Sequence, residues 1–225
     1  MKKYIAKIVG LCLVCGAIFG NGVITYAADG QTSIEELQVE EDKWEQLIEV
    51  IENLKQENPN ASEEQIAGIL NGMARTRSIE MRGISDIWNA LTNSEKTLVI
   101  RYPFDALKVN TAKNIATTQT EKMFGYSGLG DRSDAFRHGI WNAEMTILIG
   151  SEKAELFATA HEDKDTTGVE SDGFQKEEHK NMDLHNNAVG RNIGVENLDA
   201  SEEDIAMIIY NNIYSDETMF IWLHE

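Results

Sequence analysis

Helix-capping signals recur along the whole chain and limit the folds that it can adopt. A Ser or Thr is followed three residues later by Glu or Gln at 33–36, 62–65 and 92–95, which is the capping-box pattern of a helix start. Ser201 opens a further helix ahead of three acidic residues. No segment alternates apolar and polar residues as a half-buried strand does. The sequence therefore predicts an all-α fold.

The spacing of apolar residues predicts where the individual helices lie. Two acidic, amphipathic helices over 33–58 and 62–77 should form an N-terminal hairpin. Shorter helices should follow over 84–91 and 92–102. Longer ones are expected over 104–123, 131–149, 151–161, 177–193 and 201–213, and Gly194 is expected to end the helix before it. The segment 163–173 is predicted to be a polar loop, and 215–225 fits no pattern.

The first residues have the features of a secretory signal peptide. Lys2, Lys3 and Lys7 form a basic end before an apolar run over 8–18, which is short for a membrane span. Small residues up to Ala27 then offer a cleavage site. An uncleaved N-terminal anchor is the alternative interpretation. We expect a secreted, extracellular protein that keeps no stable membrane span once the signal peptide is cleaved.

These patterns divide the chain into four segments. They are a signal peptide over 1–27, an acidic N-terminal helical region over 28–83, an all-α motif-bearing domain over 84–214, and a C-terminal segment over 215–225. The N-terminal helices contain no histidine. They are expected to pack against the rest of the chain or to bind a protein partner through residues 33–77, and a pro-region is the functional alternative.

Charge and cysteine content exclude several classes of function. The formal net charge is −18, and loss of the signal peptide with its lysines makes the mature chain more negative still. Such a surface repels nucleic acid, so no nucleic-acid partner is expected, although a bound cation could still admit a phosphate substrate. Both cysteines, Cys12 and Cys15, lie in the signal peptide. The mature chain can therefore form no disulfide, thiolate metal site or cysteine nucleophile.

The stretch 131–149 carries the densest group of reactive side chains. A Gly-rich loop over 125–130 precedes it, and this loop is expected to make a tight turn that comes close to the site. The helix cap is predicted at the start of the stretch, at Ser133 or Asp134. Asp134 and His138 stand four residues apart, so they share one helix face with Asn142 four residues further on. A carboxylate, an imidazole and an amide in one row predict a functional site.

Two later motifs supply residues of the same kind. Ala160-His161-Glu162 ends one helix, and Met182-Asp183-Leu184-His185 lies in another. Imidazole nitrogens and carboxylate oxygens suit Zn, Mn or Fe, with water in an open position. The expected ligand set is Asp134, His138, His161, Glu162, Asp183 and His185. Within it, His138 and Glu162 are the expected catalytic residues, and His138 could also act as a general base without metal.

Five further residues are expected to support the site or to contact a substrate: Arg137, Trp141, Asn186, Asn187 and Arg191. The indole of Trp141 is better suited to the core than to a substrate contact. The amides of Asn186 and Asn187 could form hydrogen bonds to the Gly-rich loop. Arg191 could pair with Asp134 or Glu162, or could hold an anionic substrate group. His179 and His224 are expected at the surface. A buried polar network without catalysis would explain the same cluster.

The three motifs together resemble a known family. The order Asp134-Ala135-Phe136-Arg137-His138-x-x-Trp141, then Ala160-His161-Glu162, then Met182 to Arg191 resembles bacterial domains of unknown function. Such domains occur in secreted proteins of Gram-positive bacteria and at the C-termini of some polymorphic toxins. The resemblance covers roughly residues 91–194. It implies no established activity, and so it assigns no catalytic residue.

Two characterised families are similar in part. The order of His138, His161-Glu162 and Asp183 is similar to that of the all-α metal-dependent phosphohydrolases, except that Glu162 replaces an Asp. The Gly-rich loop before a helical histidine is similar to secreted phospholipases A2, but Gly139 stands where those enzymes have a calcium-binding Asp. Both are analogies of arrangement.

These observations lead to one expected function and two alternatives. The expected function is a secreted hydrolase, with or without a metal, that acts on a phosphoester or a lipid-like substrate. The first alternative is a non-enzymatic exported binding protein whose Asp, His and Asn cluster is a structural polar network. The second alternative is a toxin-like effector domain.

Overall fold

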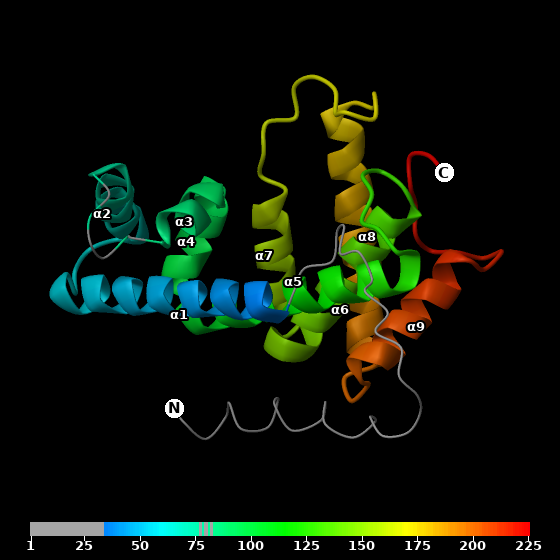
Figure 1. The fold of residues 1–225 in the computed structure, drawn as a ribbon, viewed down its shortest axis with the longest axis horizontal. Coiled ribbons are helices and arrows are strands. Elements are labelled where there is room, and N and C mark those ends of the chain that lie inside the picture. Colours follow the sequence, from blue (N-terminus) through cyan, green and yellow to red (C-terminus); the bar gives the residue numbers. More distant parts are fainter. Residues whose placement is uncertain (1–33, 77, 79–80, 82) are drawn as a thin grey trace, which may run out of the picture. The chain divides into compact units, whose positions relative to one another are not determined.

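The computed structural model describes residues 34–76, 78, 81 and 83–225, with side chains from residue 39 onward. The predicted signal peptide lies outside the described residues. Within them the chain forms α1 (Ile34–Glu57), α2 (Glu63–Thr76), α3 (Ser85–Ala90), α4 (Asn93–Arg101), α5 (Pro103–Phe124), α6 (Arg132–Ile149), α7 (Ser151–His161), α8 (Lys176–Glu196) and α9 (Glu202–Ile213) (Figure 1). This part of the chain contains an isolated bridge between Val169 and Gln175 but no strand. The predicted all-α fold is confirmed.

Among the described residues the helix starts follow the sequence closely, with one exception; the predicted Ser33 cap of α1 lies outside them. At α4 the side chain of Thr92 accepts from the backbone of Glu95, and the Glu95 side chain accepts from the backbone of Thr92, which completes the predicted capping box. At α6 the cap is Asp131, whose Oδ1 accepts from the backbone N–H groups of Ser133 and Asp134. The prediction of Ser133 or Asp134 as the cap was wrong, because the carboxylate of Asp131 satisfies both of these N–H groups.

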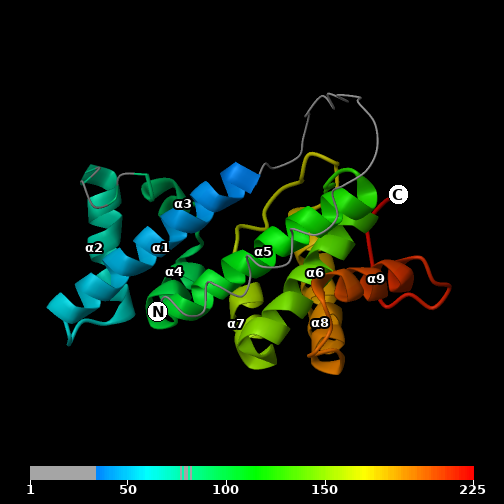
Figure 2. The same ribbon diagram turned by 60° about the horizontal axis from the view of Figure 1, so that its bottom comes forward.

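Helix α6 lies at the centre of the packing. It packs most extensively against α8 and then against α5, with further contacts to α7 and α9. Figure 2 shows α6 between α5 and α8. Nearly every residue from the first turn of α6 to Thr146 is buried, which is typical of a helix surrounded by others. Polar residues on α6 are therefore held in the core, where they need partners.

Glycines let α6 and α8 approach each other closely. A Cβ on Gly190 would lie 2.2 Å from the carbonyl oxygen of Gly139, and one on Gly194 would lie 2.7 Å from that of Ala143. A side chain at either position would push the helices apart. Gly194 lies inside α8, which continues to Glu196, so the prediction that Gly194 ends the helix was wrong. Its small size serves packing rather than termination.

The N-terminal helix packs on the motif-bearing part of the chain. Figures 1 and 2 show α1 lying along α5, and the contacts between the two helices agree. The apolar stripe of α1 buries Leu47, Ile48, Ile51 and Leu54 in the same core cluster as the later helices. At least this face of α1 is therefore used within the chain. Binding of a protein partner through residues 33–77 stays a prediction.

The C-terminal segment 215–225 is docked against α6 and α8. Phe220 is buried, and a Cβ on Gly139 would lie 2.6 Å from its ring. Asn186 of α8 donates to the carbonyl of Ile221 and accepts from its N–H, at 2.9 and 3.0 Å. The segment therefore packs across α6 and α8, although its sequence shows no regular pattern.

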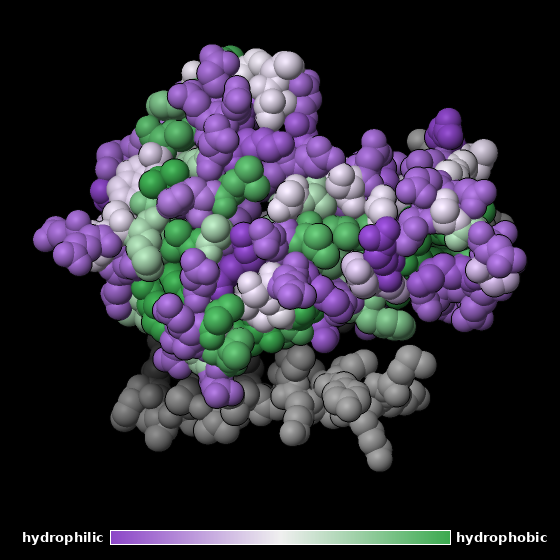
Figure 3. All heavy atoms as spheres, turned by 180° about the vertical axis from the view of Figure 1, so that it is seen from behind, coloured by the Kyte–Doolittle hydropathy of each residue, from purple (hydrophilic) through white to green (hydrophobic). Residues whose placement is uncertain are grey.

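Charged side chains cover much of the surface. The face in Figure 3 is mostly hydrophilic, with apolar side chains gathered in separate patches between the polar ones. Among the described residues, no helix has both the length and the apolar character that a membrane crossing requires. This agrees with a chain in which 26% of the residues are charged.

Candidate metal centre

Three ligand-type side chains meet where α6 and α8 pack together. Nε2 of His138 lies 3.2 Å from Oδ1 of Asp183 and 3.6 Å from Oδ1 of Asp134. One ligand atom from each residue lies within 4.8 Å of the other two, and no other group of three His, Cys, Asp or Glu in the described part of the chain does so. We call Asp134, His138 and Asp183 the triad. Glu162, at the end of α7, places Oε1 4.0 Å from Nδ1 of His138.

The Gly-rich loop and the start of α6 hold Asp134. Its Oδ2 accepts from the backbone N–H of Gly130 at 2.8 Å, and its Oδ1 pairs with the guanidinium of Arg137. Gly130 has φ of 75°, a left-handed conformation that favours glycine and turns its N–H toward the carboxylate. The first turn of a helix also favours a negative charge. The loop thus comes close to the site, as predicted.

A chain of hydrogen bonds fixes the protonation of His138. Arg191, which can only donate, binds Oδ1 of Asn142 at 3.2 Å, so the amide of Asn142 must present its N–H₂ on the other side. That N–H₂ donates to Oδ1 of Asn187 at 2.6 Å. The same oxygen lies 3.0 Å from Nδ1 of His138, which must therefore carry the proton. Nε2 of a neutral His138 is left with a lone pair that faces Asp183 and Asp134.

Burial and neighbouring charges shape the titration of the triad. Burial, reinforced by the positive charge of Arg137, lowers the pKa of His138 well below 6.5, so the imidazole is neutral at pH 7. Burial, followed by the charges of Asp134 and Glu162, raises the pKa of Asp183 to about 8. Oδ1 of Asp183 is buried and makes no hydrogen bond with the described residues. Two acceptors, Nε2 and Oδ1, thus face each other, and either a proton or a cation must lie between them.

Three of the six predicted ligands lie outside the triad: Glu162 lies beside it, and His161 and His185 have other partners. His161 has its Nδ1 2.9 Å from Oε1 of Glu95 and its Nε2 3.1 Å from Nζ of Lys164. His185 is exposed, and its Nε2 lies 2.8 Å from the carbonyl oxygen of Met219. The structure thus brings together Asp134, His138 and Asp183, with Glu162 beside them, and it does not bring His161 or His185 into that group.

The predicted partners of Arg191 and of the two amides also differ from those observed. Arg191 contacts Asn142 and, at 3.8 Å, Glu155, but neither of its predicted acidic partners. Asn186 holds the C-terminal segment, and Asn187 binds the His138 imidazole, so neither amide bonds to the Gly-rich loop. The predicted pairing partners were wrong, because spacing along one helix does not show which groups on other helices its side chains meet. A contact between Arg191 and an anionic substrate group stays a prediction. Trp141 is 9% exposed and contacts His138 edge-on, which fits its expected place in the core.

A sequence comparison places the chain in a family. The profile described as Domain of unknown function (DUF6973) matches residues 96–217. The chain belongs to this family. No curated protein and no solved structure was found to match it. The triad, Glu162 and the amide chain all lie within the DUF6973 domain, whereas α1, α2 and α3 lie before it.

A second polar cluster, around Asp172, was missed. His179 was expected at the surface but is only 6% exposed, and its Nε2 lies 3.0 Å from Oδ2 of Asp172. Nε2 of His224 lies 3.3 Å from the same oxygen. Spacing gave no signal for this cluster, because its residues come from a loop, a helix and the C-terminal segment, and His224 joins only when that segment docks. A Glu95–His161 pair was missed too, although the capping box already placed Glu95 at a helix start.

The residues of the triad fit a divalent cation. One imidazole nitrogen and two carboxylate oxygens form a donor set that suits Zn, Mn or Fe and leaves coordination positions open. Asp134, Glu162 and Asp183 also gather three carboxyl groups around the His138 imidazole, so a divalent cation would offset their negative charge. The unpaired Oδ1 of Asp183 would gain a partner.

Proposed function

We propose that this DUF6973 protein is a divalent-metal-dependent hydrolase of phosphoesters. The observation that carries the proposal is the lone pair of His138 Nε2, which faces a buried and unbonded carboxylate oxygen of Asp183 at 3.2 Å. The Asn187 amide binds the other ring nitrogen and so directs that lone pair toward Asp134 and Asp183. A hydrogen-bond partner on the other ring nitrogen is characteristic of histidines that bind metals.

Each residue near the triad has a role in this proposal. Asp134, His138 and Asp183 would hold the cation, which supplies a Lewis acid for the phosphoryl oxygens and a lowered pKa for water. Glu162 is the proton acceptor, because its buried Oε1 makes no hydrogen bond with the described residues. Arg137 binds phosphoryl oxygens, because its guanidinium reaches Asp134 while its side chain stays 31% exposed.

We also propose that a bacterium exports the protein. The support is the sequence of residues 1–27, with its basic start, short apolar run and small residues before the cleavage position. Recovery of the chain from the culture medium with an N-terminus near residue 28 is the expected result of N-terminal sequencing. A chain that starts at residue 1 and sediments with membranes would favour the uncleaved anchor.

Metal analysis with a matched pair of variants tests the proposed function. Asp183→Asn removes one carboxylate from the triad at nearly constant volume, and Asp172→Asn makes the same change in the other His-carboxylate cluster. The native protein, purified without chelator, should contain about one equivalent of Zn, Mn or Fe and hydrolyse a nitrophenyl phosphodiester. Asp183→Asn should lose both, while Asp172→Asn keeps both. A metal-free native protein that hydrolyses no phosphoester would refute the proposal.

One observation favours a non-enzymatic alternative. With a pKa of about 8, Asp183 is mostly protonated at neutral pH and can donate to His138 Nε2, which would complete a structural polar network. An Asn at position 183 can donate the same bond. If Asp183→Asn melts no lower than the native protein and neither binds metal, the cluster is structural. Removal of residues 28–83 should then abolish binding of a protein partner.

A further inference from the structure

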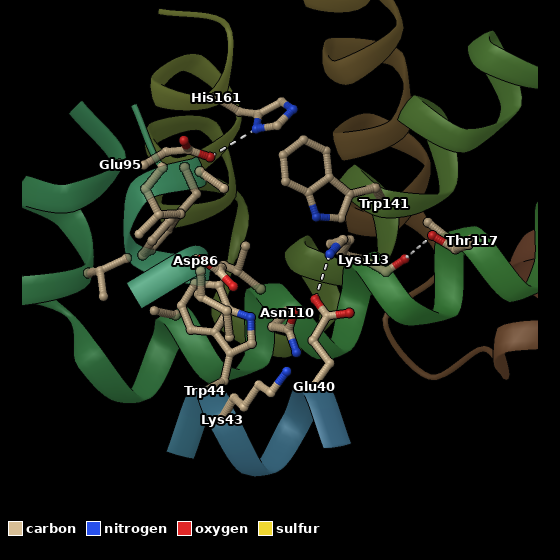
Figure 4. A pocket seen from close by; sticks show the side chains of 18 of the residues that line it. Glu40, Lys43, Trp44, Asp86, Glu95, Asn110, Lys113, Thr117, Trp141 and His161 are labelled. Carbon is tan, nitrogen blue, oxygen red and sulfur yellow. Dashed lines mark hydrogen bonds and ion pairs between the residues drawn. The ribbon is translucent and has the colours of Figure 1, made fainter. Parts of the chain in front are cut away.

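A large pocket lies beside the triad, and the proposed hydrolysis assigns no ligand to it. Its volume is about 1020 Å³, at the upper end of the range for small-molecule sites. Helices α5, α6 and α7 of the DUF6973 domain line one part of it, and α1, α3 and α4 line the other (Figure 4). Helices α1 and α3, which precede the DUF6973 domain, therefore complete a site that the domain alone would leave open.

The pocket walls are mainly apolar. Trp44 of α1, Ile87 of α3, Val99 of α4, Val109 of α5 and Phe157 of α7 all contribute to its lining. Charged side chains on the lining mostly pair with one another, as Glu40 does with Lys113 and Glu95 with His161. Replacing the water on such a surface with an apolar chain lowers the free energy.

Two buried polar atoms on the lining have no partner. The indole Nε1 of Trp141 and Oδ1 of Asn110 belong to side chains that are 9% and 4% exposed, and neither atom makes a hydrogen bond with the described residues. Figure 4 shows the indole nitrogen of Trp141 turned toward the pocket. An unpaired buried donor and acceptor call for a ligand that carries one acceptor and one donor.

The pocket reaches the triad through Arg137. This side chain lines the pocket, and its guanidinium pairs with Asp134. Trp141, on the same face of α6, separates the pocket from the His138 ring, which its own ring meets edge-on. A ligand in the pocket could therefore place an anionic group at Arg137, next to the cation ligands.

We propose that the pocket holds the acyl chain of a lysophospholipid-like amphiphile, with its phosphate at Arg137. Such a molecule has one apolar chain, an ester carbonyl that can accept from Trp141, a hydroxyl that can donate to Asn110, and a phosphate. This inference rests on the proposed function in one respect: it names the phosphoester that the triad would act on. Binding of the chain depends on the pocket alone.

Binding of lysophosphatidic acids by Asp183→Asn in EDTA tests the inference without metal or turnover. Isothermal titration with a series from octanoyl to palmitoyl should show affinity that rises by up to about fourfold per methylene, until the pocket is filled. Glycerol phosphate, which has no chain, should not bind measurably. Affinity that does not depend on chain length would overturn the inference.

Two neighbouring threonines of α5 provide a matched pair of variants. Thr117 lines the pocket and Thr118 is exposed, so Thr117→Trp should fill part of the pocket while Thr118→Trp leaves it open. Thr117→Trp should weaken binding of the palmitoyl ligand at least about tenfold, and Thr118→Trp should leave it unchanged. Trp141→Phe keeps the ring and removes the donor, so it should weaken binding by about threefold to tenfold. Equal affinities in all these proteins would refute the pocket as the binding site.

The two proposals fail in different ways. If the ligand binds with the expected chain-length dependence but metal-loaded native protein cleaves neither it nor the nitrophenyl phosphodiester, the pocket assignment stands and the hydrolase proposal fails. If simple phosphodiesters are cleaved but acyl chains do not bind, the hydrolase proposal stands and the substrate class is wrong.

Discussion

Oδ1 of Asn187 lies 3.0 Å from Nδ1 of His138, across the contact between α8 and α6. The same oxygen accepts from Asn142, whose amide is oriented in turn by Arg191. Asn187 therefore acts as a positioning residue: it determines which nitrogen of the His138 imidazole carries the proton and which nitrogen faces the two carboxylates of the triad. Because its neighbours fix its own amide, the orientation of His138 is set before any ligand binds.

Loss of this acceptor should weaken metal binding. Asn187→Ala leaves His138 free to carry its proton on Nε2, and we expect the affinity for Zn or Mn to fall by about tenfold to a hundredfold. Asn187→Asp keeps an oxygen opposite Nδ1 and should retain most of the affinity. Titration calorimetry on both variants checks the prediction. Equal losses in the two would show that the acceptor does not position the imidazole.

Adding a single methyl group at the contact between Gly139 and Gly190 should destabilise the protein. A Cβ at 190 would lie 2.2 Å from a backbone oxygen, so Gly190→Ala should destabilise the protein by about 1–3 kcal/mol or more and loosen the triad. Gly72 is the control, because a Cβ there meets nothing within 4 Å. Gly72→Ala in α2 should stabilise by about 0.4–1 kcal/mol. Urea unfolding of both variants gives the comparison.

Local signals in the sequence carried most of the helical architecture. The capping box at Thr92 and Glu95 and the apolar stripe of α1 depend on residues within one or two turns of each other, so a single sequence shows them. Gly194 misled the prediction because a glycine can end a helix or admit a neighbour. Only the position of α8 against α6 distinguishes the two roles.

The triad was partly predictable for the same reason. Asp134 and His138 share a helix face by spacing, whereas the approach of Asp183 depends on the glycine contacts between two helices. The exclusion of His161 and His185 also required the fold: Glu95 and the C-terminal segment hold these residues elsewhere, and neither partner is near them in sequence. The spacing of residues in the sequence therefore gives a set of possible ligands, and the packing of the helices determines which of them meet.

Docking of the C-terminal segment should depend on Asn186. Its side chain makes both a donor and an acceptor bond to the backbone of Ile221, so Asn186→Ala leaves two backbone groups without partners. We expect chymotrypsin to cleave the variant at Phe220 or Trp222 much faster than the native protein. Glu217→Ala, an exposed change in the same segment, should not alter the rate. Equal rates in all three proteins would show that other contacts hold the segment.

Glu144 should make the stability fall as the pH rises toward neutrality. It is 4% exposed on α6, and burial, followed by the charges of Glu202 and Glu203, raises its pKa from 4.5 to about 7. A raised carboxyl pKa means that the folded state holds the proton more tightly than the unfolded chain does. The cost of ionisation is therefore absent below about pH 4.5, grows between the two pKa values, and is complete above about pH 7.

Glu144→Gln removes this titration and should stabilise the protein at pH 8 by at most about 3 kcal/mol, with little difference at pH 4. Chemical unfolding at both pH values gives the two differences. Glu196→Gln, at an exposed position, serves as the control, because water solvates its charge in both states and its substitution should not reproduce the pH dependence. An advantage of Glu144→Gln that is the same at pH 4 and pH 8 would contradict the prediction. It would instead point to the shape of the amide, rather than the buried charge, as the cause.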